Sequence, residues 1–147
     1  MKKFKKKIEV RWSDADANRH VRHSAYYEYG AHVRIRFFAV CGFDARAMND
    51  LGIGPILFKE ECSFIKEIHP DDTITINILK GEISENGARW VLHHEIFNQN
   101  NEKCAHISVK GAWLDLEKRK LILPPKAMAD ALHTLEKGDI YVYKKKT

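Results

Sequence analysis

The segment Trp12–His23 concentrates polar and ionisable side chains within a short stretch of chain. It carries two carboxylates, an amide and two imidazoles, from Asp14, Asp16, Asn18, His20 and His23. A carboxylate can act as a nucleophile or general base, and an imidazole or amide can position water or substrate. Alternatively, the aspartates are turn and cap residues and the histidines are ordinary surface groups. The residue types alone leave both interpretations open.

The residues that follow predict the helix that would position this segment. Over Ser24–Cys41, aromatic and aliphatic residues recur at helical spacing, in a stripe wide enough to predict a helix covered on most sides. The free N–H groups at the start of such a helix, together with its dipole, stabilise an oxyanion near His23 and Ser24. We therefore expect the polar segment to lie at the N-terminal end of this helix.

The second half of the chain has the pattern of a long antiparallel sheet. Turn signals occur at Pro70–Asp72, Asn86–Gly87 and Asn100–Asn101. Between these turns apolar residues alternate with a period of two, which is typical of strands. With further strand candidates at Phe4–Trp12 and Ile56–His69, the sequence predicts an α+β fold. Five or so long strands curl around the central helix.

Length and composition indicate a single domain over residues 1–147, with a core at about 5–115. Short helices are predicted at Asp44–Leu51 and after Pro124–Pro125, and the part 124–147 ends in a basic tail. With 44% apolar and 31% charged residues, the chain has the composition of a soluble globular protein. It shows neither a membrane-spanning run nor a secretory signal, so we expect a cytoplasmic protein.

The net charge of +5 comes from the two ends of the chain. Without the eight lysines at the ends, 17 basic residues face 20 acidic ones, a net charge of −3. Lysine-rich ends can contact phosphates, but solvated and partly frayed ends are the commoner case. The acidic body argues against a nucleic-acid partner.

Metal and cofactor signals are weak. The cysteines Cys41, Cys62 and Cys104 are odd in number and form no C-x-x-C pair, which predicts reduced thiols and no zinc site. His93 and His94 are neighbours in a predicted strand, so they point to opposite faces and cannot share a ligand. No glycine-rich phosphate loop occurs. We therefore expect no metal and no cofactor.

The polar segment resembles a known signature. Trp12–Val21, with Tyr26 beyond it, resembles the D-x-D-x-N-x-H-V motif of plant-type acyl-ACP thioesterases. It is also similar to the D-x-D…H-x-x-Y segment of bacterial 4-hydroxybenzoyl-CoA and Tol–Pal-associated thioesterases. These families share the hotdog fold, in which a long antiparallel β-sheet wraps around one central α-helix.

The resemblance implies a thioesterase that hydrolyses an acyl-CoA or acyl-carrier-protein thioester, with the carrier as part of the substrate. Asp16 matches the catalytic carboxylate of these families. Asn18 and His20 match the amide and imidazole of the acyl-ACP branch, and His23 matches the histidine of the Tol–Pal-associated branch. The presence of both histidines leaves open which branch's mechanism applies.

Further positions follow from the same resemblance. In the benzoyl branch a backbone N–H at the helix start binds the thioester carbonyl, which implies binding roles for His23, Ser24 and Tyr26. The acyl-ACP branch also uses a glutamate and a cysteine. The stretch Glu60–Cys62 offers these types by composition only.

Two expectations concern the assembly and the class of protein. The chain carries one hotdog unit, so the resemblance implies a homodimer or a tetramer with shared sites, and Gly54–Lys59 is the stretch we expect a second subunit to contribute. The alternative to an enzyme is a non-catalytic hotdog module that binds an acyl chain or acts in assembly.

Overall fold

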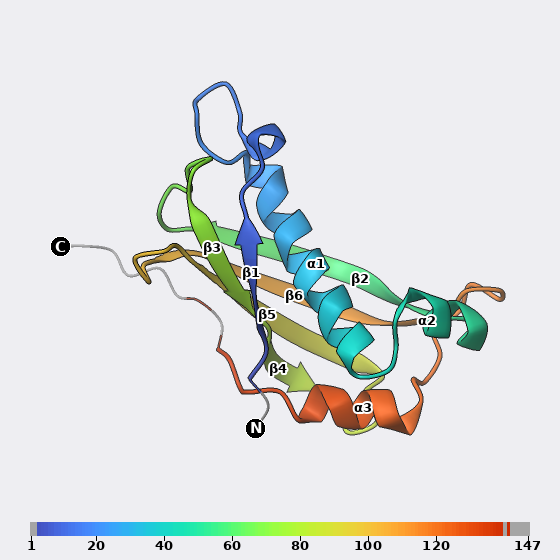
Figure 1. Cartoon of the computed structure of the whole chain (residues 1–147). Coiled ribbons are helices and arrows are strands. Elements are labelled where there is room, and N and C mark those ends of the chain that lie inside the picture. The colour runs from blue at the N-terminus through green and yellow to red at the C-terminus, as the bar shows by residue number, and fades with distance from the viewer. Residues whose placement is uncertain (1–2, 140, 142–147) are drawn as a thin grey trace.

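A computed structural model describes residues 3–139 and 141 of the chain. In this part a six-stranded antiparallel sheet wraps around one long helix, α1 (His23–Val40), which confirms the predicted α+β hotdog fold (Figure 1). The sheet has the order β1-β3-β5-β6-β2, and β4 pairs with β5. The strands are β1 (Lys5–Glu9), β2 (Ile53–Phe64), β3 (Thr73–Asn77), β4 (Leu79–Ile83), β5 (Arg89–Phe97) and β6 (Lys103–Asp115).

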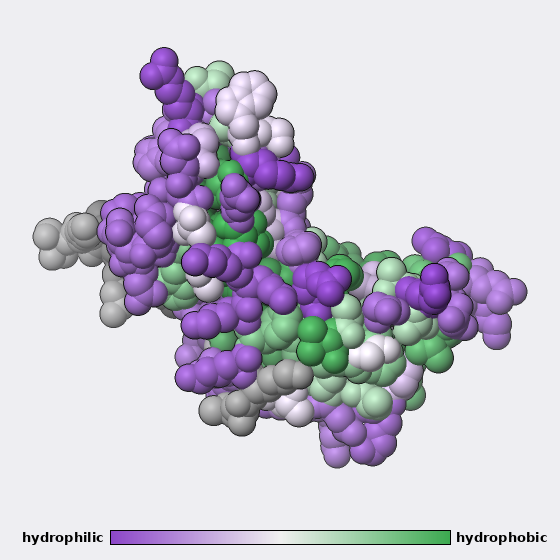
Figure 2. Space-filling model, viewed as in Figure 1, coloured by the Kyte–Doolittle hydropathy of each residue, from purple (hydrophilic) through white to green (hydrophobic). Residues whose placement is uncertain are grey.

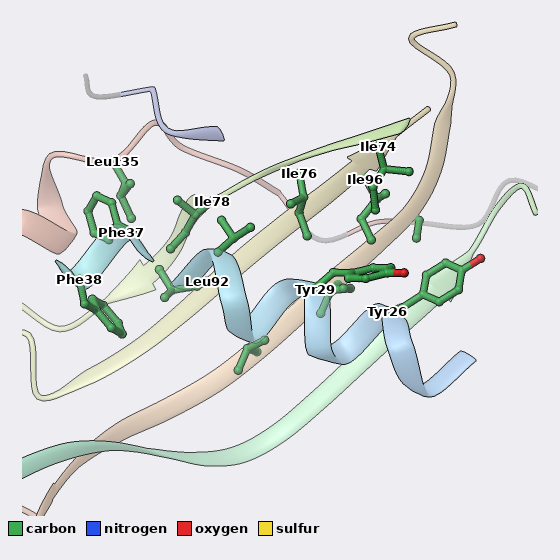
Figure 3. Close-up of a cluster of buried hydrophobic side chains, with 14 of the residues drawn as sticks. Tyr26, Tyr29, Phe37, Phe38, Ile74, Ile76, Ile78, Leu92, Ile96 and Leu135 are labelled. Atoms are coloured by element: carbon green, nitrogen blue, oxygen red, sulfur yellow. The ribbon is translucent and has the colours of Figure 1, made fainter. Parts of the chain in front are cut away.

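The core lies between α1 and the concave face of the sheet. Val33 and Phe37 of α1 are fully buried there, and the alternating isoleucines of the strands pack against the helix (Figure 3). The expected split of the adjacent histidines is also seen. His94 reaches Arg34 on α1, whereas the ring of His93 contacts Ser108 on the outer face of the sheet.

Several strand boundaries differ from the predicted ones. The strand expected at Phe4–Trp12 ends at Glu9, because the chain turns into a short 3-10 helix at Trp12–Asp14. The strand expected at Ile56–His69 is β2, which pairs with β6 from Ile53 to Phe64.

The strand predicted across Ile74, Ile76 and Ile78 is interrupted, which gives six strands instead of five. Asn77 causes the break, because its side-chain oxygen accepts the Glu95 N–H at 2.7 Å in place of a regular ladder hydrogen bond. The strand β3 therefore ends at Asn77 and β4 begins at Leu79.

Two short helices cover the ends of the sheet. The helix α2 (Ala45–Leu51) is capped by Asp44, whose carboxylate accepts the Ala47 N–H at 2.8 Å. The helix α3 (Lys126–His133) follows the two prolines and buries Met128 and Leu132. No helix in the described part is long and apolar enough to cross a membrane. The C-terminal lysines of the predicted basic tail lie outside the described residues.

Candidate active site

The polar segment forms a compact loop directly above the N-terminal end of α1 (Figure 1). Ala15 and Val21 form an antiparallel bridge across its base. The N–H of Asp16 donates to the carbonyl oxygen of His20 at 2.8 Å, and Arg19 adopts a positive φ of 66° at the tip. Hydrophilic side chains dominate the surface around this loop (Figure 2).

The first aspartate of the motif is a structural residue. Asp14 is fully buried and accepts hydrogen bonds from the Tyr29 hydroxyl at 2.7 Å and from the Arg11 backbone and side chain at 3.1 Å each. Burial alone would raise the pKa of Asp14, but the hydrogen bonds from Tyr29 and Arg11 lower it. The ionised carboxylate therefore ties the loop to α1, and the turn-and-cap interpretation describes Asp14.

The second aspartate is exposed and only partly engaged. One oxygen of Asp16 accepts the N–H of Asn18 at 2.8 Å and the N–H of His20 at 3.4 Å. The other oxygen has no hydrogen-bond partner among the described residues. The backbone bonds fix the orientation of the carboxylate, and the second oxygen stays available to a substrate or water.

A pocket of about 260 Å³ opens beside this carboxylate at the start of α1. Four of the predicted site residues line it, namely Asp16, His20, His23 and Tyr26. Two others do not, because Asn18 lies at the exposed tip of the loop and Ser24 is exposed in the first turn of α1. Their roles remain predictions.

The remaining walls come from β2 and the residues after it, which the motif did not indicate. Phe64 packs edge-on against the ring of Tyr26, with centroids 4.9 Å apart, and the Glu67 carboxylate lies 3.5 Å from His20 Nε2. These residues are about forty positions from the motif and carry no local signal, so only the fold identifies them. Burial raises the pKa of Tyr26 to about 12, and its hydroxyl is therefore protonated at neutral pH.

The Glu60–Cys62 stretch does not line this pocket. Glu61 points to the outer face and pairs with Lys59 at 2.7 Å. Cys62 lies on the opposite side of the strand, where burial and the nearby Glu60 carboxylate raise its pKa to about 12. Its sulfur is therefore a thiol at neutral pH and a poor nucleophile.

A larger cavity of about 660 Å³ lies on the outer face of the sheet, beside His93 and Ser108. It contains no residue of the polar segment and lies away from the start of α1. The smaller pocket is the better candidate, because it combines an available carboxylate, two imidazoles and a helix N-terminus. Within the described part of the chain, no cluster of three or more potential metal ligands occurs.

Comparison with known proteins identifies the family of the chain. Residues 10–132 match the family model of the Thioesterase-like superfamily, and the chain belongs to this superfamily.

Individual relatives are more distant. A curated putative esterase of Aquifex aeolicus (strain VF5) is 29% identical over 75 residues, which span 51% of this chain and only 59% of the relative. A Staphylococcus aureus protein solved in complex with CoA is 14% identical, with a TM-score of 0.86 over 99% of this chain and 96% of that one. A 1,4-dihydroxy-2-naphthoyl-CoA thioesterase from Synechocystis is 16% identical, with a TM-score of 0.79 over 90% of this chain and 96% of that one.

Proposed function

We propose that the chain hydrolyses an acyl-CoA or acyl-carrier-protein thioester to a carboxylic acid and a free thiol. The proposal rests on the carboxylate of Asp16, which lies beside a pocket at the N-terminus of α1. One of its oxygens accepts backbone hydrogen bonds, and the other has no hydrogen-bond partner among the described residues. Membership of the Thioesterase-like superfamily supports this reaction class, and the CoA complex of a protein with the same fold favours CoA as the carrier. The test is thiol release from acyl-CoA substrates by the wild type and by an Asp16→Asn variant.

The pocket supplies the groups that thioester hydrolysis requires. The first N–H groups of α1, at His23 and Ser24, have no intrahelical partner and would hold the thioester carbonyl oxygen. Asp16 would take a proton from water as the water oxygen bonds to the carbonyl carbon. The C–S bond then breaks, and the thiolate leaves with that proton. In the alternative mechanism, an Asp16 oxygen bonds to the carbonyl carbon, and the C–S bond breaks to release the thiolate and leave a mixed anhydride on Asp16. Water then cleaves this anhydride to give the carboxylic acid and free Asp16, and the proton lost by the water neutralises the thiolate.

The side chain of His20 is held by neighbouring residues and that of His23 is not. We therefore expect their replacement by alanine to lower activity by different amounts. His20 is held between Glu67 and the ring of His69, whereas His23 is the exposed first residue of α1. We expect His20→Ala to lower kcat/KM by about 100-fold, within the range of a positioned acid–base group. His23→Ala should have a smaller effect, because its backbone N–H remains.

Steady-state kinetics on one acyl-CoA, with His32→Ala as control, would measure both effects, since His32 is exposed on α1 outside the pocket. Equal and small losses for both variants would remove histidine from the mechanism.

We further propose that the chain forms a homodimer, or a pair of such dimers, through the free edge of β2. This strand pairs only with β6 among the described strands and exposes Leu57, Phe58 and Phe64. Two copies paired antiparallel along this edge would place Gly54–Lys59 of the partner subunit beside Phe64 and hence beside the pocket. In this arrangement each pocket would draw on both subunits.

Light scattering tests the assembly. The wild type should have about twice the 17.1 kDa mass of one chain, or about four times that mass. Leu57→Lys should shift the protein to a monomer and lower activity together, because a charge on the paired edge opposes association. Leu123→Lys, at an exposed position outside the pocket, is the control. A fully active monomeric wild type would contradict the shared site.

A further inference from the structure

The cavity of about 660 Å³ on the outer face of the sheet has no part in the proposed hydrolysis. Residues of the paired strands β5 and β6 form its floor, namely Val91, His93, Ser108 and Lys110. Its walls come from β4, from β2 and from the segment 137–139, which follows α3. This segment lies beside β4, where Lys137 forms a parallel bridge with Lys80 (Figure 1). We call this hollow the outer-face cavity.

His93 is a buried polar residue in the floor of the outer-face cavity, and only 2% of it is exposed. Its Nδ1 lies 2.9 Å from Ser108 Oγ and 3.4 Å from His106 Nε2. Its Nε2 has no hydrogen-bond partner among the described residues and lies beside Gly81, where a side-chain carbon would be 2.8 Å from it. Because Gly81 has no side chain and itself lines the cavity, Nε2 stays open toward the cavity.

The neighbouring groups determine which nitrogen of His93 carries the proton. The ammonium group of Lys103 only donates, and it lies 3.0 Å from His106 Nδ1, so the neutral His106 ring carries its proton on Nε2. That N–H donates to His93 Nδ1, and the neutral His93 ring therefore carries its proton on Nε2. Both rings are neutral at neutral pH, because burial lowers the pKa of His93 and lowers that of His106 to about 4. The floor of the cavity thus presents an N–H donor without an acceptor in the described part of the chain.

A lysine without an ion pair stands close to this donor. Lys110 lies on the same face of β6, two residues from Ser108, which pairs with His93. Such diagonal neighbours are about 7–8 Å apart, within reach of a lysine side chain. Lys59 of β2 lies directly opposite Lys110, and like charges in this position repel each other. Glu61 pairs with Lys59 at 2.7 Å, whereas Lys110 has no ion pair among the residues that the structure describes.

The charges around the cavity limit the charge of a ligand. Three lysines and three acids line it, namely Lys59, Lys110, Lys137, Glu61, Glu82 and Asp139. Phosphate carries more than one negative charge at neutral pH, so the exposed carboxylates of Glu82 and Asp139 would repel it. A carboxylate carries one charge and has two acceptor oxygens, one for the N–H donor and one for an ammonium group.

We propose that the outer-face cavity binds a small carboxylic acid in its ionised form, with the carboxylate between His93 Nε2 and the ammonium group of Lys110. The N–H of His93 and the ammonium group donate to the two oxygens, and the apolar part of the acid lies on Val91. This site shares no lining residue with the pocket beside Asp16 and does not depend on the proposed hydrolysis.

The test is a calorimetric titration of the full chain with sodium benzoate, and a second one with inorganic phosphate. Benzoate should bind with a Kd on the order of 1 mM, and phosphate at least about tenfold more weakly. The imidazole ¹⁵N resonances should show His93 protonated on Nε2, and benzoate should shift them. Absence of saturable benzoate binding, or a His93 resonance that benzoate does not shift, would overturn the proposal. Phosphate that binds as tightly as benzoate would overturn the carboxylate assignment.

Lys110→Met removes the ammonium group and keeps a long side chain. The Kd for benzoate should increase about tenfold, because one of the two charge-assisted contacts is lost. The matched control is Lys120→Met, at an exposed lysine outside the cavity, which should leave the Kd unchanged. Equal Kd values for Lys110→Met and the wild type would refute the site.

Gly81→Ala tests the N–H donor and leaves every charge in place. The added methyl group would lie 2.8 Å from His93 Nε2 and block it, so the Kd for benzoate should again increase about tenfold. A folded Gly81→Ala variant with the wild-type Kd would contradict the role of His93. If this variant does not fold, Lys110→Met decides the question, since Lys110 is exposed.

Discussion

Asp16→Asn should lower kcat/KM for thioester hydrolysis by about 10²–10⁴-fold, the contribution of a positioned acid–base group. The amide keeps an oxygen that can accept the backbone N–H groups of Asn18 and His20, so the loop should keep its shape. It lacks the basicity needed to take a proton from water and is a poor nucleophile. The loss should therefore appear in kcat, with KM little changed.

The matched control for this variant is Asp50→Asn, which makes the same chemical change at an exposed position on α2. Both variants should unfold at the wild-type temperature. An Asp16→Asn variant with full turnover would assign the chemistry to another residue.

Asp14→Asn should have the complementary effect, a large loss of stability. The buried carboxylate accepts hydrogen bonds from Tyr29 and Arg11 and lies 3.5 Å from Arg22. Replacing it with a neutral amide leaves these donors without their charged partner, which we expect to cost roughly 3 kcal/mol in the free energy of unfolding. Urea denaturation at neutral pH would measure this loss, with Asp16→Asn as the exposed control.

The loss of stability caused by Asp14→Asn should also depend on pH, and it should be larger at neutral pH than at acidic pH. The pKa of Asp14 is lower in the folded state than its ordinary value, so its ionised form stabilises the fold above that ordinary value. This contribution disappears as the pH falls through the folded-state pKa. The difference between wild type and Asp14→Asn should therefore shrink below about pH 4. A difference that stays constant down to strongly acidic pH would show that Asp14 does not act through its charge.

Much of the scaffold could be predicted because its signals are local. The helical spacing over Ser24–Cys41 predicts α1 to within one residue at each end, since each turn of that helix meets the sheet. Apolar residues alternate with a period of two along β5. This alternation places His94 on the side of the sheet that faces α1, and so predicts which face of β5 points inward. The break at Asn77 was not predictable, because it depends on a side-chain hydrogen bond to a strand that is distant in sequence.

The site could be predicted only in part for the same reason. Asp14 and Asp16 are both aspartates and lie two positions apart. Their roles differ because Asp14 is buried against Tyr29 of α1 and bonded to Arg11, whereas Asp16 is exposed. Phe64 enters the pocket through the pairing of β2 with β6, and Glu67 enters it from the segment that follows β2; nothing in their local sequence marks either residue.

The pocket beside Asp16 is the proposed site of thioester cleavage. The most direct measurement follows free thiol and carboxylic acid released from octanoyl-CoA by wild type and Asp16→Asn at equal concentration. The wild type should release one thiol and one acid per turnover, over many turnovers, and the variant should react at a rate close to the uncatalysed background. Equal rates for the two proteins would contradict the proposed site and would favour an acyl-binding module without catalysis.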